Sequence, residues 1–238
     1  MSAVFNSLRP HSGFEFSASV ICFNQLKLGE IISELRTLGV KRIHIDLIDN
    51  AFSGLGLPKE ILTDIRARFS MPVDVHFMVT NPESLVEFAL SQKVNCVAVH
   101  QSALTNRLVA SLHAASQVGT EVSLVLGPGE APSEESIKKT GAKRLTAMSV
   151  MPGAAGRPFE PRVFDTLRQA ARIKARGLIQ RIEVDGAVGP QTLPMMSRAG
   201  ADIGVVGSTV FPNRDTVGNH LQELLKGMME NGQSAGMI

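Results

Sequence analysis

The most restrictive feature of the chain is an alternation of short apolar segments with longer amphipathic ones. The apolar segments predict eight buried strands: FSASVI, RIHIDLI, VDVHFMV, CVAVH, EVSLVL, RLTAMSV, RIEVD and IGVVGS. Between and after them the pattern predicts eight helices, near residues 25–38, 58–69, 82–92, 104–118, 133–140, 161–176, 190–199 and 216–230. This is the element count of a (β/α)8 TIM barrel. A doubly wound open sheet is the alternative, but such sheets usually contain fewer strands.

The 238 residues predict a single domain, a (β/α)8 barrel with its core over about 17–230. No linker or low-complexity stretch divides the chain, and residues 1–15 and the tail NGQSAGMI are expected to be loose ends. A net charge of +2 is too small to indicate nucleic acid or an anionic membrane as partner. There is no run of 18 apolar residues for a membrane span and no signal-peptide pattern, so we expect a cytoplasmic protein.

Four ionisable residues lie at or near the carboxyl ends of three predicted strands that are otherwise mostly apolar. His44 and Asp46 lie two positions apart, so both point to the same face of their strand. His76 and Asp185 lie at or near the ends of two further strands. In a barrel the carboxyl ends of the strands form the active-site face, so these side chains become neighbours. Two imidazoles and two carboxylates predict a site for one divalent metal ion, with Zn²⁺, Fe²⁺, Mn²⁺ and Co²⁺ as candidates.

Small residues fill the loops after the last three strands, in MPGAAGRPF (151–159), DGAVG (185–189) and VGSTVF (206–211). Phosphate sites in such barrels are usually built after strands seven and eight, because small residues let backbone N–H groups approach an anion. We therefore expect a phosphate against the backbone of five residues: Gly156, Gly186, Ala187, Gly207 and Ser208. The two thiols, Cys22 and Cys96, are expected to be reduced core residues.

From about Ser17 to Phe211 the chain resembles the ribulose-phosphate 3-epimerase family. The matching motifs, in order, are an early-strand serine at Ser19, His-x-Asp-x-x-Asp at 44–49, Asp-x-His-x-Met at 74–78, Met-Ser-Val-x-Pro-Gly at 148–153, Glu-Val-Asp-Gly at 183–186 and Gly-Ser at 207–208. Each motif alone would be weak, but their joint order is specific.

The resemblance implies a function and a set of roles. Members move a proton at C3 of a ketose phosphate, and the implied acid–base pair is Asp46 and Asp185, each also a metal ligand. A divalent cation held by His44, Asp46, His76 and Asp185 would stabilise the ene-diolate as a Lewis acid. The substrate contacts implied are Ser19, His76, Met78, Met148, Gly153, Gly156, Gly186, Ala187, Gly207 and Ser208. The partner implied is a small-molecule sugar phosphate. Because members of the family form oligomers, the resemblance also implies a homo-oligomer.

The chain departs from the family in its loops rather than in its ligands. The loop at 50–57 is rebuilt, and Ala187 replaces a glycine. The family's Pro-Gly-Phe-Gly-Gly-Gln reads Pro-Gly-Ala-Ala-Gly-Arg over 152–157. Arg157 could contact the phosphate or lie in solvent, and solvent is favoured because the family has a neutral Gln there. Changed loops around an intact metal site suggest a different sugar phosphate or a shifted role.

Three functions remain open from the sequence. The first is a metal-dependent ketose-phosphate 3-epimerase acting on ribulose 5-phosphate and xylulose 5-phosphate, or on a related sugar phosphate such as allulose 6-phosphate. The second is another phosphate-binding-barrel enzyme, a lyase or decarboxylase, although such enzymes typically place a Lys on an inner strand. The third is a non-catalytic sugar-phosphate binder, which would not need two opposed carboxylates.

Overall fold

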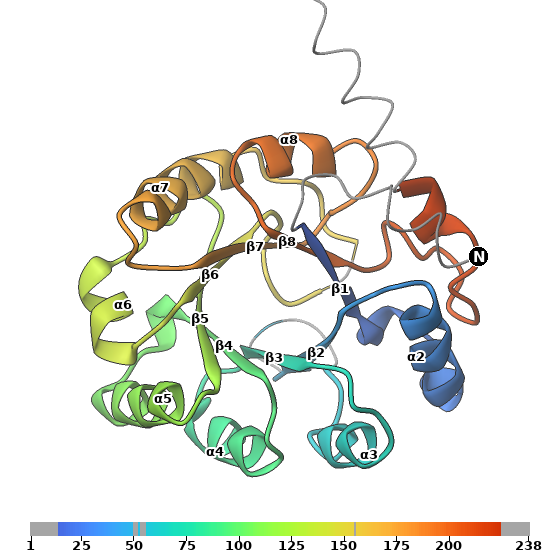
Figure 1. Cartoon of the computed structure of the whole chain (residues 1–238), viewed down its shortest axis with the longest axis horizontal. Coiled ribbons are helices and arrows are strands. Elements are labelled where there is room, and N and C mark those ends of the chain that lie inside the picture. The colour runs from blue at the N-terminus through green and yellow to red at the C-terminus, as the bar shows by residue number, and fades with distance from the viewer. Residues whose placement is uncertain (1–13, 50–51, 53–55, 155, 225–238) are drawn as a thin grey trace, which may run out of the picture.

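The computed structural model describes residues 14–49, 52, 56–154 and 156–224, in which eight parallel strands close into a barrel in the order β1 to β8 (Figure 1). The predicted (β/α)8 barrel is therefore confirmed. The strands are β1 (Glu15–Ser19), β2 (Arg42–Ile48), β3 (Val73–Met78), β4 (Cys96–His100), β5 (Glu121–Leu126), β6 (Arg144–Met148), β7 (Arg181–Asp185) and β8 (Ile203–Val206). Of these, β2, β4, β5 and β7 coincide with the predicted segments.

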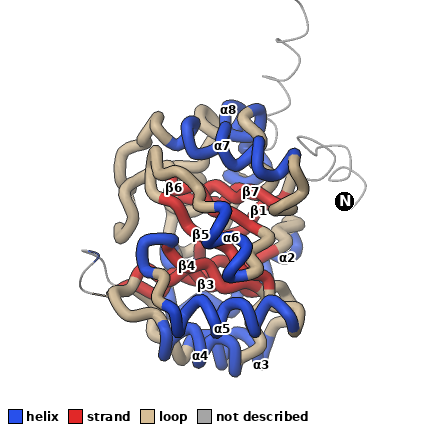
Figure 2. Tube along the Cα trace, turned by 90° about the vertical axis from the view of Figure 1, so that its left-hand side faces the viewer, coloured by secondary structure: helices blue, strands red, loops and turns tan. Residues whose placement is uncertain are grey.

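The helices form a ring outside the strands, and a side view shows them flanking the barrel (Figures 1 and 2). They are α2 (Leu28–Thr37), α3 (Ile61–Arg68), α4 (Glu83–Ser91), α5 (Asn106–Gln117), α6 (Glu134–Thr140), α7 (Val163–Ala175) and α8 (Leu193–Arg198), with 3-10 turns η1 (Val20–Cys22), η2 (Gln25–Lys27) and η4 (Gln101–Ala103). The helix expected over 216–230 begins later than predicted: residues 216–219 are not helical, helix is seen over 220–224, and residues 225–230 lie outside the described part of the chain. Within the described ranges, no helix combines the length and apolar content needed to cross a membrane.

Along a strand, side chains alternate between facing the surrounding helices and facing the barrel interior. On β3, Val73, Val75 and Phe77 belong to the apolar core shared with the helices. Asp74 and His76 face the barrel interior, where they bond to residues from other strands. All of β3 is buried on both faces, as expected for a parallel sheet covered by helices. The polar residues in the predicted strands therefore line the barrel axis.

A buried ionic cluster fills the amino-terminal half of the interior. Arg144 is completely buried, and its Nη1 lies 2.7 Å from Asp74 Oδ2 and 3.0 Å from Glu183 Oε2. Its Nη2 bonds to Glu121, and Arg42 Nε lies 2.6 Å from the same Asp74 oxygen. We call these five residues the floor cluster. Asp74 and Glu183 each precede a candidate metal ligand by two positions on the same strand, so the floor cluster lies directly beneath that site.

Candidate metal centre and active site

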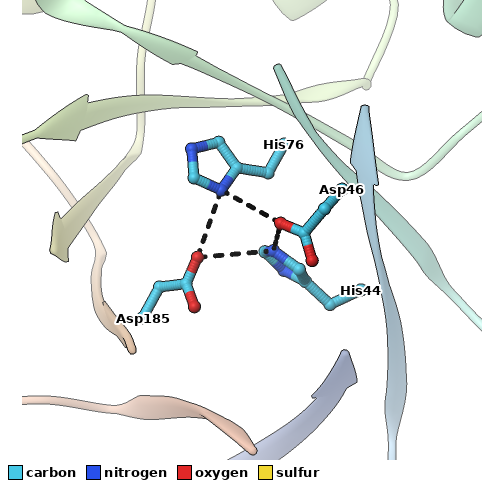
Figure 3. A group of neighbouring side chains, drawn as sticks. All are labelled: His44, Asp46, His76 and Asp185. Carbon is cyan, nitrogen blue, oxygen red and sulfur yellow. Dashed lines mark hydrogen bonds and ion pairs between the residues drawn. The ribbon is translucent and has the colours of Figure 1, made fainter. Parts of the chain in front are cut away.

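The four predicted ligands meet at one point at the carboxyl ends of β2, β3 and β7 (Figure 3). His76 Nδ1 lies 3.1 Å from Asp185 Oδ2 and 3.4 Å from Asp46 Oδ1. His44 Nε2 lies 3.2 Å from Asp46 Oδ1 and 3.5 Å from Asp185 Oδ2. One donor atom from each residue lies within 4.8 Å of all the others. This spacing lets four ligands surround a single ion with only small adjustments, because metal–nitrogen and metal–oxygen bonds are about 2.0–2.2 Å.

Strand register explains why these residues converge. Asp46 is paired with His76 across β2 and β3. His44 lies one step below Asp46 on the same face. Asp185 ends β7 and approaches from the opposite wall of the barrel, which lets its carboxylate face that of Asp46 across the site (Figure 3). Every ligand therefore stands on a strand, so the barrel rather than a loop sets the geometry.

The electrostatics of the cluster suit a cation. Burial alone would raise the pKa of Asp185, but the neighbouring His44 and His76 overcome this and lower it to about 2. The pKa of Asp46 is lowered in the same way, against burial, chiefly by His44. Conversely, the two carboxylates raise the pKa of both imidazoles although burial opposes it. Both carboxylates are therefore ionised at neutral pH, and a metal ion would compete with protons for the same imidazole nitrogens.

Two neighbours hold the ligands in place from outside. Ser19 Oγ donates a 2.8 Å hydrogen bond to Asp46 Oδ2 and leaves Oδ1 for the centre of the site. His100, the last residue of β4, lies behind His76, with 3.1 Å between the two Nε2 atoms. Burial, and then the charge of His76, lower the pKa of His100 to about 3. His100 was not among the predicted site residues, because a single histidine at a strand end is equally compatible with ordinary core packing.

A pocket of about 700 Å³, part of it open to solvent, lies above the cluster. Its wall contains eleven of the predicted site residues: Ser19, Asp46, Met78, Met148, Gly153, Gly156, Asp185, Gly186, Ala187, Gly207 and Ser208. His44 and His76 are fully buried beneath the carboxylates and do not line it. The side chains that ligands in the pocket can reach are therefore the two carboxylates, not the imidazoles.

Two residues of the pocket wall differ from the expectations. Arg157 lines the pocket and is partly buried, although the sequence favoured solvent. Cys22 was expected in the core, but it is only half-buried and also lines the pocket, while Cys96 is buried as expected. Burial raises the pKa of Cys22 to about 12, so it remains a thiol rather than a nucleophilic thiolate. Most of the rebuilt 50–57 loop, and Ala155, lie outside the described residues.

The backbone of two glycine-bearing loops adopts positive φ angles where it borders the pocket. Ala187 has φ +45°, a left-handed conformation that is uncommon for a residue with a Cβ and that explains why a glycine suits this position. Gly153 has φ +104°, and a Cβ there would collide with the carbonyl oxygen of Phe52. The loops after β2 and β6 therefore touch across the mouth of the barrel.

Solved structures with the same fold have little sequence in common with this chain. N-(5'-phosphoribosyl)anthranilate isomerase from Pyrococcus furiosus has a TM-score of 0.61 at 12% identity, covering 91% of this chain and 99% of that one. A 3-hexulose-6-phosphate synthase has a TM-score of 0.60 at 17% identity, covering 90% of this chain and 99% of that one. These likenesses show the barrel fold alone.

Sequence relatives are more specific. Ribulose-phosphate 3-epimerase 2 of Cupriavidus necator is 30% identical over 210 residues, covering 85% of this chain and 86% of that protein. The ribulose-phosphate 3-epimerases of Aquifex aeolicus and Escherichia coli K12 are 30% and 28% identical, covering 79% and 83% of this chain and 85% and 88% of their own lengths. The sequence model described as "Ribulose-phosphate 3 epimerase family" matches residues 15–211, which include all four candidate ligands. The chain therefore belongs to the ribulose-phosphate 3-epimerase family.

Proposed function

We propose that the protein is a metal-dependent epimerase that inverts C3 of a ketose phosphate, either ribulose 5-phosphate and xylulose 5-phosphate or a related sugar phosphate such as allulose 6-phosphate. One observation carries the proposal. Asp46 and Asp185 face each other across a metal-type donor set at the base of a pocket, and the upper wall of that pocket is formed by small-residue loops. Family membership makes an isomerase acting on carbohydrates the matching reaction class.

Inversion at C3 needs a proton removed from one face of the sugar and another delivered to the opposite face. Asp46 and Asp185 come from opposite walls of the barrel, and both reach the pocket. Because both carboxylates are ionised in the free site, one of them must take up a proton from solvent before turnover. The ionised carboxylate then takes the C3 proton while the protonated one returns its proton from the far side, and the roles exchange in the reverse direction. Met78 and Met148 line the same pocket and would keep water from the reacting carbon.

A divalent cation held by His44, Asp46, His76 and Asp185 would act as a Lewis acid toward the oxygens of the sugar. The donor set fits such an ion, because it offers two imidazole nitrogens and two carboxylate oxygens that lie within 4.8 Å of one another. Zn²⁺, Fe²⁺, Mn²⁺ and Co²⁺ all accept this donor set. Ser19 would keep Asp46 oriented through its hydrogen bond.

The phosphate is proposed to lie against the backbone of Gly156, Gly186, Ala187, Gly207 and Ser208. Arg157 stands in the same wall and has no ion-pair partner in the described part of the chain. A guanidinium and the metal-type carboxylates in the wall of one pocket match a substrate that carries both a phosphate and metal-binding oxygens.

Arg157→Gln should raise KM for the ketose phosphate about tenfold with a smaller change in kcat. A charge-assisted hydrogen bond contributes about 1.5–3 kcal/mol, and the lower end applies because Arg157 is partly exposed. The matched control is Arg162→Gln, since Arg162 pairs with Glu160 outside the pocket and should leave KM unchanged. Equal KM values for wild type and Arg157→Gln would mean that this guanidinium does not contact the phosphate.

The proposed function is tested by solvent deuterium exchange. Purified protein loaded with Zn²⁺, Mn²⁺, Fe²⁺ or Co²⁺ is incubated in D₂O with a panel of pentulose and hexulose phosphates, and C3 is followed by NMR. We expect deuterium at C3 and conversion to the epimer for at least one phosphate, and loss of both after chelation. Carbon–carbon cleavage would instead support a lyase or decarboxylase, although no lysine occurs among the described residues lining the pocket. Binding without exchange would support a sugar-phosphate binder.

Three further properties belong to the same proposal. We expect the whole chain to form one domain, to assemble as a homo-oligomer and to work in the cytoplasm. A small-molecule sugar phosphate is the proposed partner, without nucleic acid or membrane.

A further inference from the structure

The second nitrogen of His76 is engaged by another imidazole. His76 Nε2 and His100 Nε2 are 3.1 Å apart, the ring centroids are 5.1 Å apart and the planes differ by 29°. The contact between the rings includes their two Nε2 atoms at hydrogen-bond distance. An N–H of one ring can therefore point at the lone pair of the other.

The direction of this hydrogen bond follows from the metal centre. His76 Nδ1 faces Asp46 and Asp185, so Nδ1 is the atom available to a metal. A ligating nitrogen must be unprotonated, which leaves the ring proton on Nε2. Nε2–H then has to donate, and His100 Nε2 has to accept. His100 can accept only as a neutral ring with its own proton on Nδ1.

We propose that His100 is a positioning residue for the metal centre: by accepting from His76 Nε2 it fixes the tautomer and the ring orientation that present Nδ1 to the ion. His100 is not itself a ligand, because its Nε2 lies on the far side of His76 from the four donors. It is held rigidly, since it ends β4, is buried, and packs against Phe52 with ring centroids 5.9 Å apart.

The other imidazole ligand provides a contrast within the same site. His44 Nδ1 is buried with no hydrogen-bond partner among the residues described. The outer support of the two imidazole ligands is therefore asymmetric, and within the described residues His76 is the imidazole that has an identified side-chain partner. Loss of such an outer partner commonly weakens metal binding about 10–100-fold.

The test measures metal affinity rather than turnover. Co²⁺ is titrated into metal-free wild type, His100→Gln and His100→Leu in competition with a chelator, with the visible Co²⁺ spectrum as readout. Gln places an amide acceptor near the position of the imidazole Nε2, whereas Leu fills similar space without an acceptor. His113→Leu, which removes an exposed imidazole on α5, is the matched control. Circular dichroism and thermal unfolding verify the fold of each variant.

We expect the Co²⁺ dissociation constant to rise about 10–100-fold in His100→Leu, to stay within about threefold of wild type in His100→Gln, and to be unchanged in His113→Leu. Wild-type affinity in His100→Leu would overturn the proposal, and so would equal weakening in the folded Leu and Gln variants, because packing rather than hydrogen bonding would then matter.

A second measurement needs no variant. Long-range ¹H–¹⁵N NMR of Zn²⁺-loaded wild type should show His76 protonated at Nε2 and His100 protonated at Nδ1. A His76 ring protonated at Nδ1 would overturn the proposal even if His100→Leu did not fold. The inference rests on the metal centre of the proposed function, but neither experiment uses a sugar. The absence of epimerase activity would therefore be a separate result.

Discussion

Asp185→Asn is expected to abolish C3 exchange while the barrel remains folded. The amide keeps the size of the side chain but can neither take nor return a proton, and loss of one acid–base group costs about 10²–10⁴-fold in rate. Asp185 also supplies one of the four donor atoms, so the fall in kcat should reach at least the upper part of that range. Asp46→Asn should behave in the same way for the opposite face of the sugar.

The measurement separates the two carboxylates by starting from each epimer. Deuterium incorporation at C3 is followed from both directions, with metal content determined for every sample. Asp165→Asn is the matched control, because this carboxylate on α7 is exposed and pairs only with Arg168 in the described structure. Near-normal exchange in a metal-loaded Asp185→Asn or Asp46→Asn variant would refute transfer by two carboxylates.

Arg144→Met should destabilise the protein by about 3–5 kcal/mol, the cost typical of removing one partner from a buried ion pair. The side chain is fully buried and bonds to Asp74, Glu183 and Glu121. Methionine fills comparable space, but it leaves these carboxylates with Arg42 as the remaining guanidinium of the floor cluster. The free energy of unfolding is measured by denaturant titration of the metal-free protein.

Arg168→Met supplies the comparison for this second variant. Arg168 also pairs with a carboxylate, but on the exposed surface of α7, where such pairs contribute about 0–1 kcal/mol. If both methionine variants lower the free energy of unfolding by the same small amount, the buried ion pairs of Arg144 stabilise the fold no more than an exposed pair does. Retention of metal binding in Arg144→Met would further show that the ligands above it are positioned independently.

The barrel and its ligand set could be predicted because both follow from local rules. The spacing of apolar residues and the length of each segment distinguish strands from helices. In a barrel the carboxyl ends of the strands then meet at one face. His44 and Asp46 gave the clearest indication of a site. Burying two ionisable groups on one face of an apolar strand costs free energy unless they bind each other or a common ligand.

The features that escaped prediction depend on long-range geometry. Arg144 reads as a charged residue at the start of a strand, and only the closed barrel brings it to Asp74 on the far wall. A lone His100 is as compatible with ordinary packing as with support of a ligand, so the pattern could not select it. The inward placement of Arg157 depends on the path of a loop, for which no periodic signal exists.

The contact between Gly153 and Phe52 joins two loops that lie about a hundred residues apart in the chain. A side chain at 153 would have to displace backbone, not merely rotate a neighbour, and Phe52 also packs on His100 beneath. A substitution in one of these loops is therefore tolerated only if the other loop leaves room for it. A mutational library restricted to one loop would mostly sample clashes, whereas one that varies both together could reach new substrate preferences. Over evolutionary time the same coupling would favour paired replacements, with the four strand-borne ligands left untouched.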